Sequence, residues 1–195
     1  METSETSVSL LERLAGTPTD DDWRRLDELY RPLLRAWVAR AGVLASDIDD
    51  LPQEVLVVVF RKVAGFERRR QGAFRAWLRT ILANEVRDYF RNQKYRPIAT
   101  GDSGFQGRLD ELESPDSALS RLWDREHDQH VIASLMQRVQ IDFDPKTWQA
   151  FRRHVQEGEP AGQVAEALDL SLNSVLLAKS RLLKRLRQEA AGLVE

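Results

Sequence analysis

Residues 72–96 read Gly72-Ala-Phe-Arg-Ala-Trp-Leu-Arg-Thr-Ile-Leu-Ala-Asn-Glu-Val-Arg-Asp-Tyr-Phe-Arg-Asn-Gln-Lys-Tyr-Arg96. The apolar residues recur at the three- and four-residue spacing of an amphipathic helix, and the basic residues fall on its other faces. The apolar positions are Phe74, Trp77, Leu78, Ile81, Leu82 and Val86. Cations that alternate with aromatic rings suit opened DNA, because cations bind phosphates and rings stack on unpaired bases. For any single residue, the alternative is an ordinary helix with core aromatics and solvated charges.

The charge of this region differs from that of its surroundings. Between Arg61 and Arg96 there are eleven basic and three acidic residues, a local net charge of +8, in a chain of formal net charge −2. Residues 1–50 and residues 100–130 each have a net charge of −5. Alternating blocks of this kind are typical of a protein that meets DNA on some faces and a basic protein surface on others. The alternative is that the acidic segments only keep the basic ones in solution.

The composition limits the class of protein. A chain of 195 residues, 42% hydrophobic and 31% charged, is long enough for one large or two small soluble domains. The absence of cysteine excludes disulfides and thiolate zinc sites, and three scattered histidines argue against a metal centre. No apolar stretch approaches the ~20 residues that span a bilayer, and the acidic start is unlike a signal peptide. We therefore expect a cytoplasmic protein.

A short helix over residues 8–14 and two longer helices are expected before the basic one. Thr19 and the three aspartates after it predict a helix start, and the helical spacing continues to Ala41 with a kink at Pro32. The polar and acidic segment 46–52, which ends in proline, opens the next helix, which runs to about Val63. One β-branched triplet within it is weak evidence for a strand. We therefore interpret the chain as all-α.

The segment after the basic helix predicts a division into two helical domains. Pro97 should end that helix, and residues 98–118 are rich in glycine, serine, proline and acids, which is typical of a flexible linker. The predicted domains are therefore residues 1–97 and 119–195. The acidic character of the linker should keep it off the DNA backbone. The sequence leaves open whether this linker or the acidic N-terminus is autoinhibitory.

Residues 159–187 have the pattern of a helix-turn-helix. A short first helix should bury Val164, a turn should pass through Asp169, and the second helix should bury Val175 and Leu182. The start of the second helix would then face a major groove, with its basic residues near phosphates. Many helical pairs share this pattern, but its position after a linker and its basic second helix favour DNA binding.

Taken in order, these motifs resemble those of the sigma factors of bacterial RNA polymerase, in particular the two-domain extracytoplasmic-function group. Residues 49–56 are similar to the family's Asp-Leu-x-Gln-Glu-Val helix, residues 74–91 to its promoter-melting helix, and residues 163–187 to its C-terminal helix-turn-helix. The resemblance covers most of residues 22–96 and 130–190. The ordered set is far more specific than any one motif.

The resemblance implies that the N-terminal domain binds the clamp helices of core RNA polymerase and reads the opened minus-ten element. It assigns polymerase binding to Asp50, Gln53 and Glu54. It assigns minus-ten DNA binding to Arg75, Trp77, Arg79, Asn84, Arg87 and Arg91. It also places the loop from Phe66 to Gly72 near a base extruded from the stack. For Trp77, a purely structural role in the core is the favoured interpretation.

The same resemblance implies that the C-terminal domain reads the minus-thirty-five element as duplex DNA. The candidate contacts are Asn173, Ser174, Leu177, Lys179, Ser180, Arg181 and Lys184. The chain departs from the common pattern at Asp169, where a turn glycine is frequent, and at Leu176-Leu177, where polar or basic residues are usual. Apolar side chains can contact thymine methyl groups but cannot make bidentate hydrogen bonds to a base. Recognition would therefore depend on the shape of the DNA or on phosphate contacts. Alternatively, the two leucines pack against another protein.

The sequence contains no catalytic constellation. There is no phosphate-cradling glycine loop, nucleophile motif or zinc spacing, and we expect neither an enzyme nor a cofactor. The one candidate for a divalent metal site is the cluster of Asp47, Asp49 and Asp50 with Glu54, although acids at a helix start ordinarily act as capping groups.

The expected partners are core RNA polymerase and promoter DNA. An anti-sigma factor is a further candidate, because many relatives are held inactive by one, but no residue here identifies it. The main alternative is a conventional helix-turn-helix regulator whose N-terminal domain senses a signal or dimerises. A second alternative is an interaction protein that occupies the polymerase clamp without reading promoters.

Overall fold

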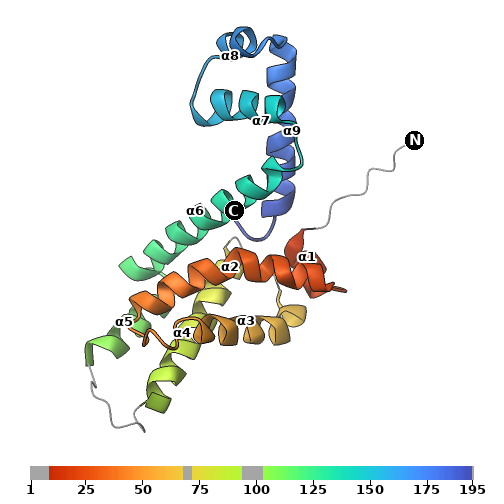
Figure 1. Cartoon of the computed structure of the whole chain (residues 1–195). Coiled ribbons are helices and arrows are strands. Elements are labelled where there is room, and N and C mark those ends of the chain that lie inside the picture. Colours follow the sequence, from red (N-terminus) through yellow and green to blue (C-terminus); the bar gives the residue numbers. More distant parts are fainter. Residues whose placement is uncertain (1–8, 68–71, 94–102, 195) are drawn as a thin grey trace. The chain divides into compact units, whose positions relative to one another are not determined.

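The computed structural model describes residues 9–67, 72–93 and 103–194. Every regular element within these ranges is a helix, which confirms the all-α interpretation (Figure 1). The elements are α1 Leu10–Ala15, α2 Asp20–Arg40, α3 Asp50–Lys62, η1 Val63–Gly65, α4 Ala73–Gln93, α5 Ser103–Glu113, α6 Ala118–Gln140, α7 Pro145–Phe151, η2 Arg152–Gln156, α8 Ala161–Leu168 and α9 Leu172–Ala190. Here η1 is a 3-10 helix and η2 is a π-helix. Of these described helices, none has the length and apolarity needed to cross a membrane.

The chain forms two compact units, and the division between them falls inside α6. The N-terminal unit is Val8–Val131 together with the last residues of the chain, and the C-terminal unit contains Ile132–Ala191. The sequence predicts a second domain from residue 119, so the first half of α6 belongs to a different unit from the one expected.

The N-terminal unit is built on α2, whose start the sequence specifies closely. Thr19 Oγ1 accepts a hydrogen bond from the backbone N of Asp22 at 3.3 Å, and the Asp22 carboxylate accepts one from the backbone N of Thr19 at 3.0 Å. This reciprocal capping box satisfies two of the free N–H groups at the helix start. Arg13 of α1 donates to the other Asp22 oxygen at 2.7 Å. The helix then continues across Pro32 to Arg40.

Helices α3 and α4 pack together and, with α2, form the core of this unit (Figure 1). The valine triplet of α3 is helical, with Val59 buried and Val57 exposed. The apolar stripe of α4 faces inward as its spacing predicts. Its buried members are Phe74, Leu78, Ile81, Leu82, Ala83 and Val86.

The segment predicted as a flexible linker instead contains α5, and this prediction is corrected. Leu109 and Leu112 lie one turn apart and are both buried where α5 packs against α4. The averaged composition of residues 98–118, rich in glycine, serine and acids, hides this short apolar pattern. Residues 94–102 lie outside the described ranges.

The first half of α6 completes the core of the N-terminal unit. The side chain of Trp123 is fully buried, its ring lies 5.2 Å from that of Trp37, and its Nε1 donates to the backbone oxygen of Arg75 at 3.1 Å. One turn later, buried His127 makes a 3.1 Å hydrogen bond through Nε2 with the hydroxyl of Tyr30. Because Trp123 packs against Trp37 of α2 and bonds to Arg75 of α4, the first half of α6 belongs to the N-terminal unit, and the division falls later than expected.

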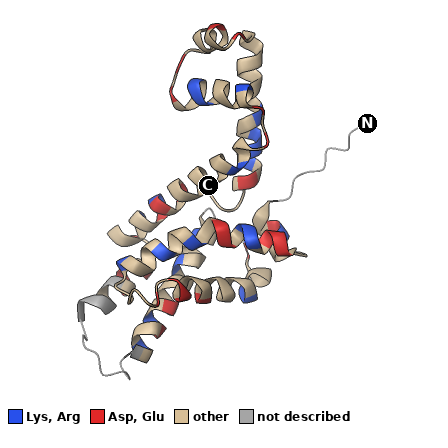
Figure 2. Cartoon of the chain, viewed as in Figure 1, with Lys and Arg blue, Asp and Glu red and all other residues tan. Residues whose placement is uncertain are grey.

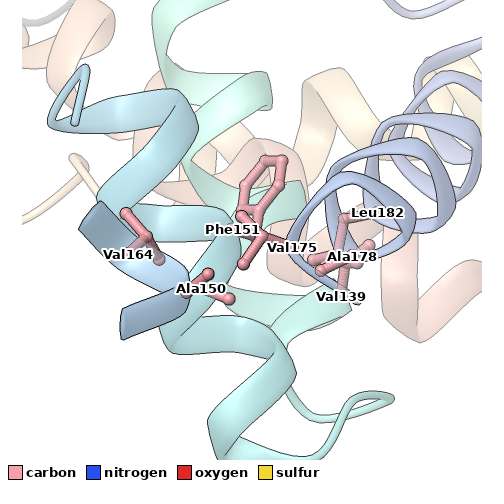
Figure 3. Packing of buried hydrophobic residues seen from close by; sticks show 8 residues of the cluster. Val139, Ala150, Phe151, Val164, Val175, Ala178 and Leu182 are labelled. Carbon is pink, nitrogen blue, oxygen red and sulfur yellow. The ribbon is translucent and has the colours of Figure 1, made fainter. Parts of the chain in front are cut away.

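The C-terminal unit gathers the second half of α6 with α7, α8 and α9 around one apolar cluster (Figure 3). The buried members are Val139, Ala150, Phe151, Val164, Ala165, Val175, Ala178 and Leu182. A three-residue turn joins α8 to α9, and Asp169 within it has a left-handed φ of 50°. Short polar side chains tolerate this region better than most, so an aspartate can stand where glycine is frequent.

Candidate nucleic-acid interface

The structure separates the arginines of α4 into two groups, and the first group is enclosed by protein. Arg75 pairs through Nη1 with Asp128 of α6 at 2.8 Å and through Nε with Asp124 at 3.5 Å. Arg79, with only 5% of its surface exposed, donates from Nη1 to Asp124 at 3.2 Å and to the backbone oxygen of Ser120 at 3.4 Å. Both guanidinium groups therefore hold α6 against α4 in this structure.

The second group lies along the exposed side of the last turns of α4. Asn84 and Arg91 are exposed, and Arg87 lies between them at helical spacing. Among the described residues, Arg91 pairs with a neighbour on its own helix, Asp88, at 2.8 Å, and its side chain is 67% exposed. We call Asn84, Arg87 and Arg91 the α4 stripe.

Arg87 is held by acids from α5. Its Nη2 lies 2.7 Å from Glu113 and 3.5 Å from Asp110, and its Nη1 donates to Asn84 Oδ1 at 2.8 Å. The hydrogen bond with Glu113 raises the pKa of the Arg87 guanidinium above its usual value. Acidic side chains of α5 therefore pair with one of the cations that the family resemblance assigns to DNA binding.

Trp77 has the surroundings of a packing residue. Its half-buried ring lies 4.9 Å from that of Phe66 and 5.6 Å from that of Phe74. The candidate loop for an extruded base begins at Phe66, but residues 68–71 lie outside the described residues. At the end of this loop, Gly72 has φ 67°, and a Cβ there would lie 2.9 Å from the Arg75 guanidinium. The turn therefore needs glycine at this position.

The residues assigned to polymerase binding lie on the exposed side of the first turns of α3. Asp50, Gln53 and Glu54 are all exposed. Asp50 and Glu54 also line a pocket of about 490 Å³ between α3 and the end of α4. The other lining residues are Asp47, Leu51, Glu85, Asp88, Tyr89 and Asn92.

The pocket has an excess of negative charge. Partial burial, followed by the nearby charges of Asp88 and Glu54, raises the pKa of the Glu85 carboxyl. Such a site favours an incoming cation, because the cation would relieve the repulsion among the carboxylates.

The sequence did not single out Glu85 and Asp88 as site residues, although their i, i+3 spacing on α4 places them on one face of that helix. In the described parts of the chain, no group of three or more histidine, cysteine or acidic side chains is arranged to hold a metal ion.

The candidate contacts of α9 lie mostly on its solvent side. Asn173, Leu177, Lys179, Ser180, Arg181 and Lys184 are exposed. Ser174 is half-buried and belongs to the helix cap, because its backbone N donates to Ser171 Oγ at 3.0 Å and its hydroxyl bonds to the same oxygen at 2.8 Å. Figure 2 shows the basic residues along this helix.

Comparison with known proteins gives one family match. Residues 26–96 match the family described as Sigma-70 region 2. No curated protein matches the chain. Among solved structures, one of CnrH in complex with the cytosolic domain of CnrY is similar, at 20% identity and a TM-score of 0.36. The match covers 91% of this chain and 92% of the CnrH chain.

Proposed function

We propose that the chain is a sigma-70 family member, because residues 26–96 match region 2 of that family, and that it binds core RNA polymerase and directs promoter-specific initiation. We also propose that it is of the two-domain extracytoplasmic-function type, on the motifs of residues 163–187. The protein would supply specificity while the polymerase performs the chemistry.

The observation that supports this function best is that the α3–α4 helix pair has an acidic surface and, adjoining it, a basic surface. The α3 start and the end of α4 form an acidic pocket, and the α4 stripe carries cations on the adjoining side of α4. An acidic pocket suits basic side chains of a protein, whereas exposed arginines suit phosphates. One helix pair therefore has a surface for each of the two proposed partners.

In this function, Asp50, Gln53 and Glu54 contact the polymerase clamp, and Glu85 and Asp88 add negative charge to the pocket that Asp50 and Glu54 line. The α4 stripe contacts the opened minus-ten strand. Arg75 and Arg79 are proposed to act by positioning α4, because acids of α6 enclose their head groups. This assignment changes their role from direct DNA contact to support of the helix that makes it.

The C-terminal unit is proposed to bind duplex DNA of the minus-thirty-five element through α9. Exposed Asn173 and Ser180 provide hydrogen-bonding groups, and Lys179, Arg181 and Lys184 provide cations for phosphates. An anti-sigma protein is proposed as a regulatory partner on the family resemblance alone.

Charge reversal at the acidic pocket tests the polymerase contact. We expect Asp50→Arg to weaken binding to purified core polymerase at least tenfold, because it places a like charge against a basic partner surface. The matched control is Glu28→Arg, which makes the same charge change at an exposed site on α2. Binding is measured by competition with a labelled wild-type chain. Equal affinity of both variants for core polymerase would contradict the proposed role of the pocket.

A further inference from the structure

The exposed face of α9 combines apolar and basic side chains in a defined order. At about 100° per residue, the side opposite buried Val175, Ala178 and Leu182 contains a set of exposed residues. These are Asn173, Leu176, Leu177, Ser180, Lys184 and Arg187. The leucines therefore lie in the first half of the helix, and the two cations of this face lie in the second half.

The two leucines do not contribute to the core of the C-terminal unit. Leu176 and Leu177 are 45% and 43% exposed, while the neighbouring core position Val175 is fully buried. Two adjacent exposed leucines on a small unit are a feature that folding does not require, and exposed apolar surface of this kind marks an interaction site.

The charge of the helix identifies the kind of partner. Residues 172–188 include five basic residues and no acid. Lys179, Arg181, Lys184 and Arg187 are exposed, whereas Arg185 is paired with Asp142 at 3.2 Å and with Glu189 at 2.8 Å. A polyanion such as duplex DNA complements this surface better than a basic protein does.

On duplex DNA, the first half of such a helix reaches the base edges while the second half lies along phosphates. Leucine has no hydrogen-bonding group, so the only base feature of the major groove that it can recognise by attraction is the C5-methyl group of thymine. We propose that Leu176 and Leu177 select thymine in the duplex promoter element by contact with these methyl groups. The inference rests on the proposed function of α9 as a reader of duplex DNA and names the base that it selects.

The size of the effect follows from the burial of one methyl group. Removing about one CH₂ equivalent from an apolar contact costs roughly 0.8 kcal/mol, which is a factor of about four in affinity. Lys184 contributes differently, because a phosphate contact is the same for every sequence.

Substitution of deoxyuridine for thymidine tests the inference, because it removes the methyl group and leaves the hydrogen-bonding groups of the base unchanged. Duplexes are first selected from a random pool by the complex of the full chain with core polymerase. Each thymidine of the selected duplex is then replaced in turn, and dissociation constants are measured for the complex.

We expect one or two positions at which deoxyuridine weakens binding about fourfold, with this sensitivity lost in Leu176→Ala or Leu177→Ala. Two control variants separate this effect from others. Ile141→Ala removes an exposed apolar side chain of the same unit outside α9 and should keep the full methyl sensitivity. Lys184→Ala should weaken binding to both forms of the duplex equally.

Duplex binding without methyl sensitivity, or methyl sensitivity that survives both leucine variants, would overturn this inference alone. If the leucine variants keep methyl sensitivity and instead lose an anti-sigma protein, the leucines form a protein interface. Absence of any duplex binding by the C-terminal unit in the complex would overturn the proposed function of α9 together with the inference.

Discussion

At the scale of single residues, the surroundings of each arginine on α4 decide its role. Arg79 and Arg91 are both basic, and the sequence gives them the same assignment. Arg79 is almost entirely enclosed and bonded to Asp124 and Ser120, whereas Arg91 is exposed and pairs with Asp88 one turn away on its own helix. An enclosed cation supports the fold, and an exposed cation is available for a ligand.

Alanine substitutions should separate these two roles. We expect Arg79→Ala to reduce the free energy of unfolding by about 2 kcal/mol, because it removes a buried guanidinium that hydrogen-bonds to buried Ser120 and half-buried Asp124. Arg91→Ala should leave stability within about 0.5 kcal/mol, because surface ion pairs contribute little, and should still impair promoter opening. Urea unfolding and permanganate footprinting of opened promoter DNA measure the two effects. A stable Arg79→Ala variant that fails to open DNA would contradict the structural role of Arg79.

The Asp22 carboxyl at the start of α2 makes the stability of the fold depend on pH. Burial alone would raise the pKa of its carboxyl, but hydrogen bonds from Arg13 and Thr19 outweigh burial and lower that pKa. A group with a lowered folded-state pKa contributes stability above its unfolded pKa of about 3.9 and loses it as the pH falls through the folded value.

We therefore expect Asp22→Asn to cost about 1–2 kcal/mol of unfolding free energy at pH 7, through loss of a charge-assisted bond and a helix cap. The difference from the wild-type chain should shrink as the pH falls below about 4. Asp20→Asn, at an exposed position of the same helix start, is the control. A cost that stays constant between pH 7 and pH 3 would show that the carboxylate charge is not the cause.

At the scale of elements, the first half of α6 acts as part of the N-terminal unit. Trp123 and His127 are fully buried against α2 and α4 residues, and Glu126 pairs with Arg40 at 2.9 Å. The region 2 match ends at residue 96, so the folded unit extends well beyond the matched segment.

Truncation of one side chain tests this extension. We expect Trp123→Ala to reduce the free energy of unfolding of the N-terminal unit by about 3–5 kcal/mol, the usual cost of removing a large buried aromatic side chain. Ile132→Ala, at an exposed apolar position on the same helix, should cost less than about 0.5 kcal/mol. Thermal unfolding followed by the fluorescence of the remaining tryptophans measures both. A similarly small loss of unfolding free energy in both variants would mean that α6 does not stabilise the N-terminal unit.

In the proposed function, the acids of α5 that pair with Arg87 compete with the phosphates of DNA for its guanidinium. Neutralising its acids in Asp110→Asn/Glu113→Gln should strengthen binding of opened minus-ten DNA by about threefold, a modest gain because partly exposed ion pairs are weak. Glu111→Gln changes an exposed acid of the same helix and should have no effect. Fluorescence anisotropy with a fork-junction promoter measures the change. An unchanged affinity in the double variant would rule out an inhibitory role for these acids.

At the scale of the whole molecule, the sequence predicts the helices better than their grouping. Strong apolar spacing and caps such as Thr19 identify α2, α3, α4 and α9, because these signals are local. The role of α5 and the division inside α6 depend on contacts between distant residues, such as Trp37 with Trp123, which no local pattern contains. For the same reason, the sequence places Arg75 and Arg79 on the correct helix but gives no sign that acids of α6 enclose them.

The most direct test of the central claim is run-off transcription with purified bacterial core polymerase on a pool of genomic promoter fragments, with and without this protein. We expect specific new start sites that appear only when the protein is present and that Asp50→Arg abolishes. A chain that binds duplex DNA alone as a symmetric dimer, and that adds no start site to core polymerase, would contradict the claim and support a conventional helix-turn-helix regulator.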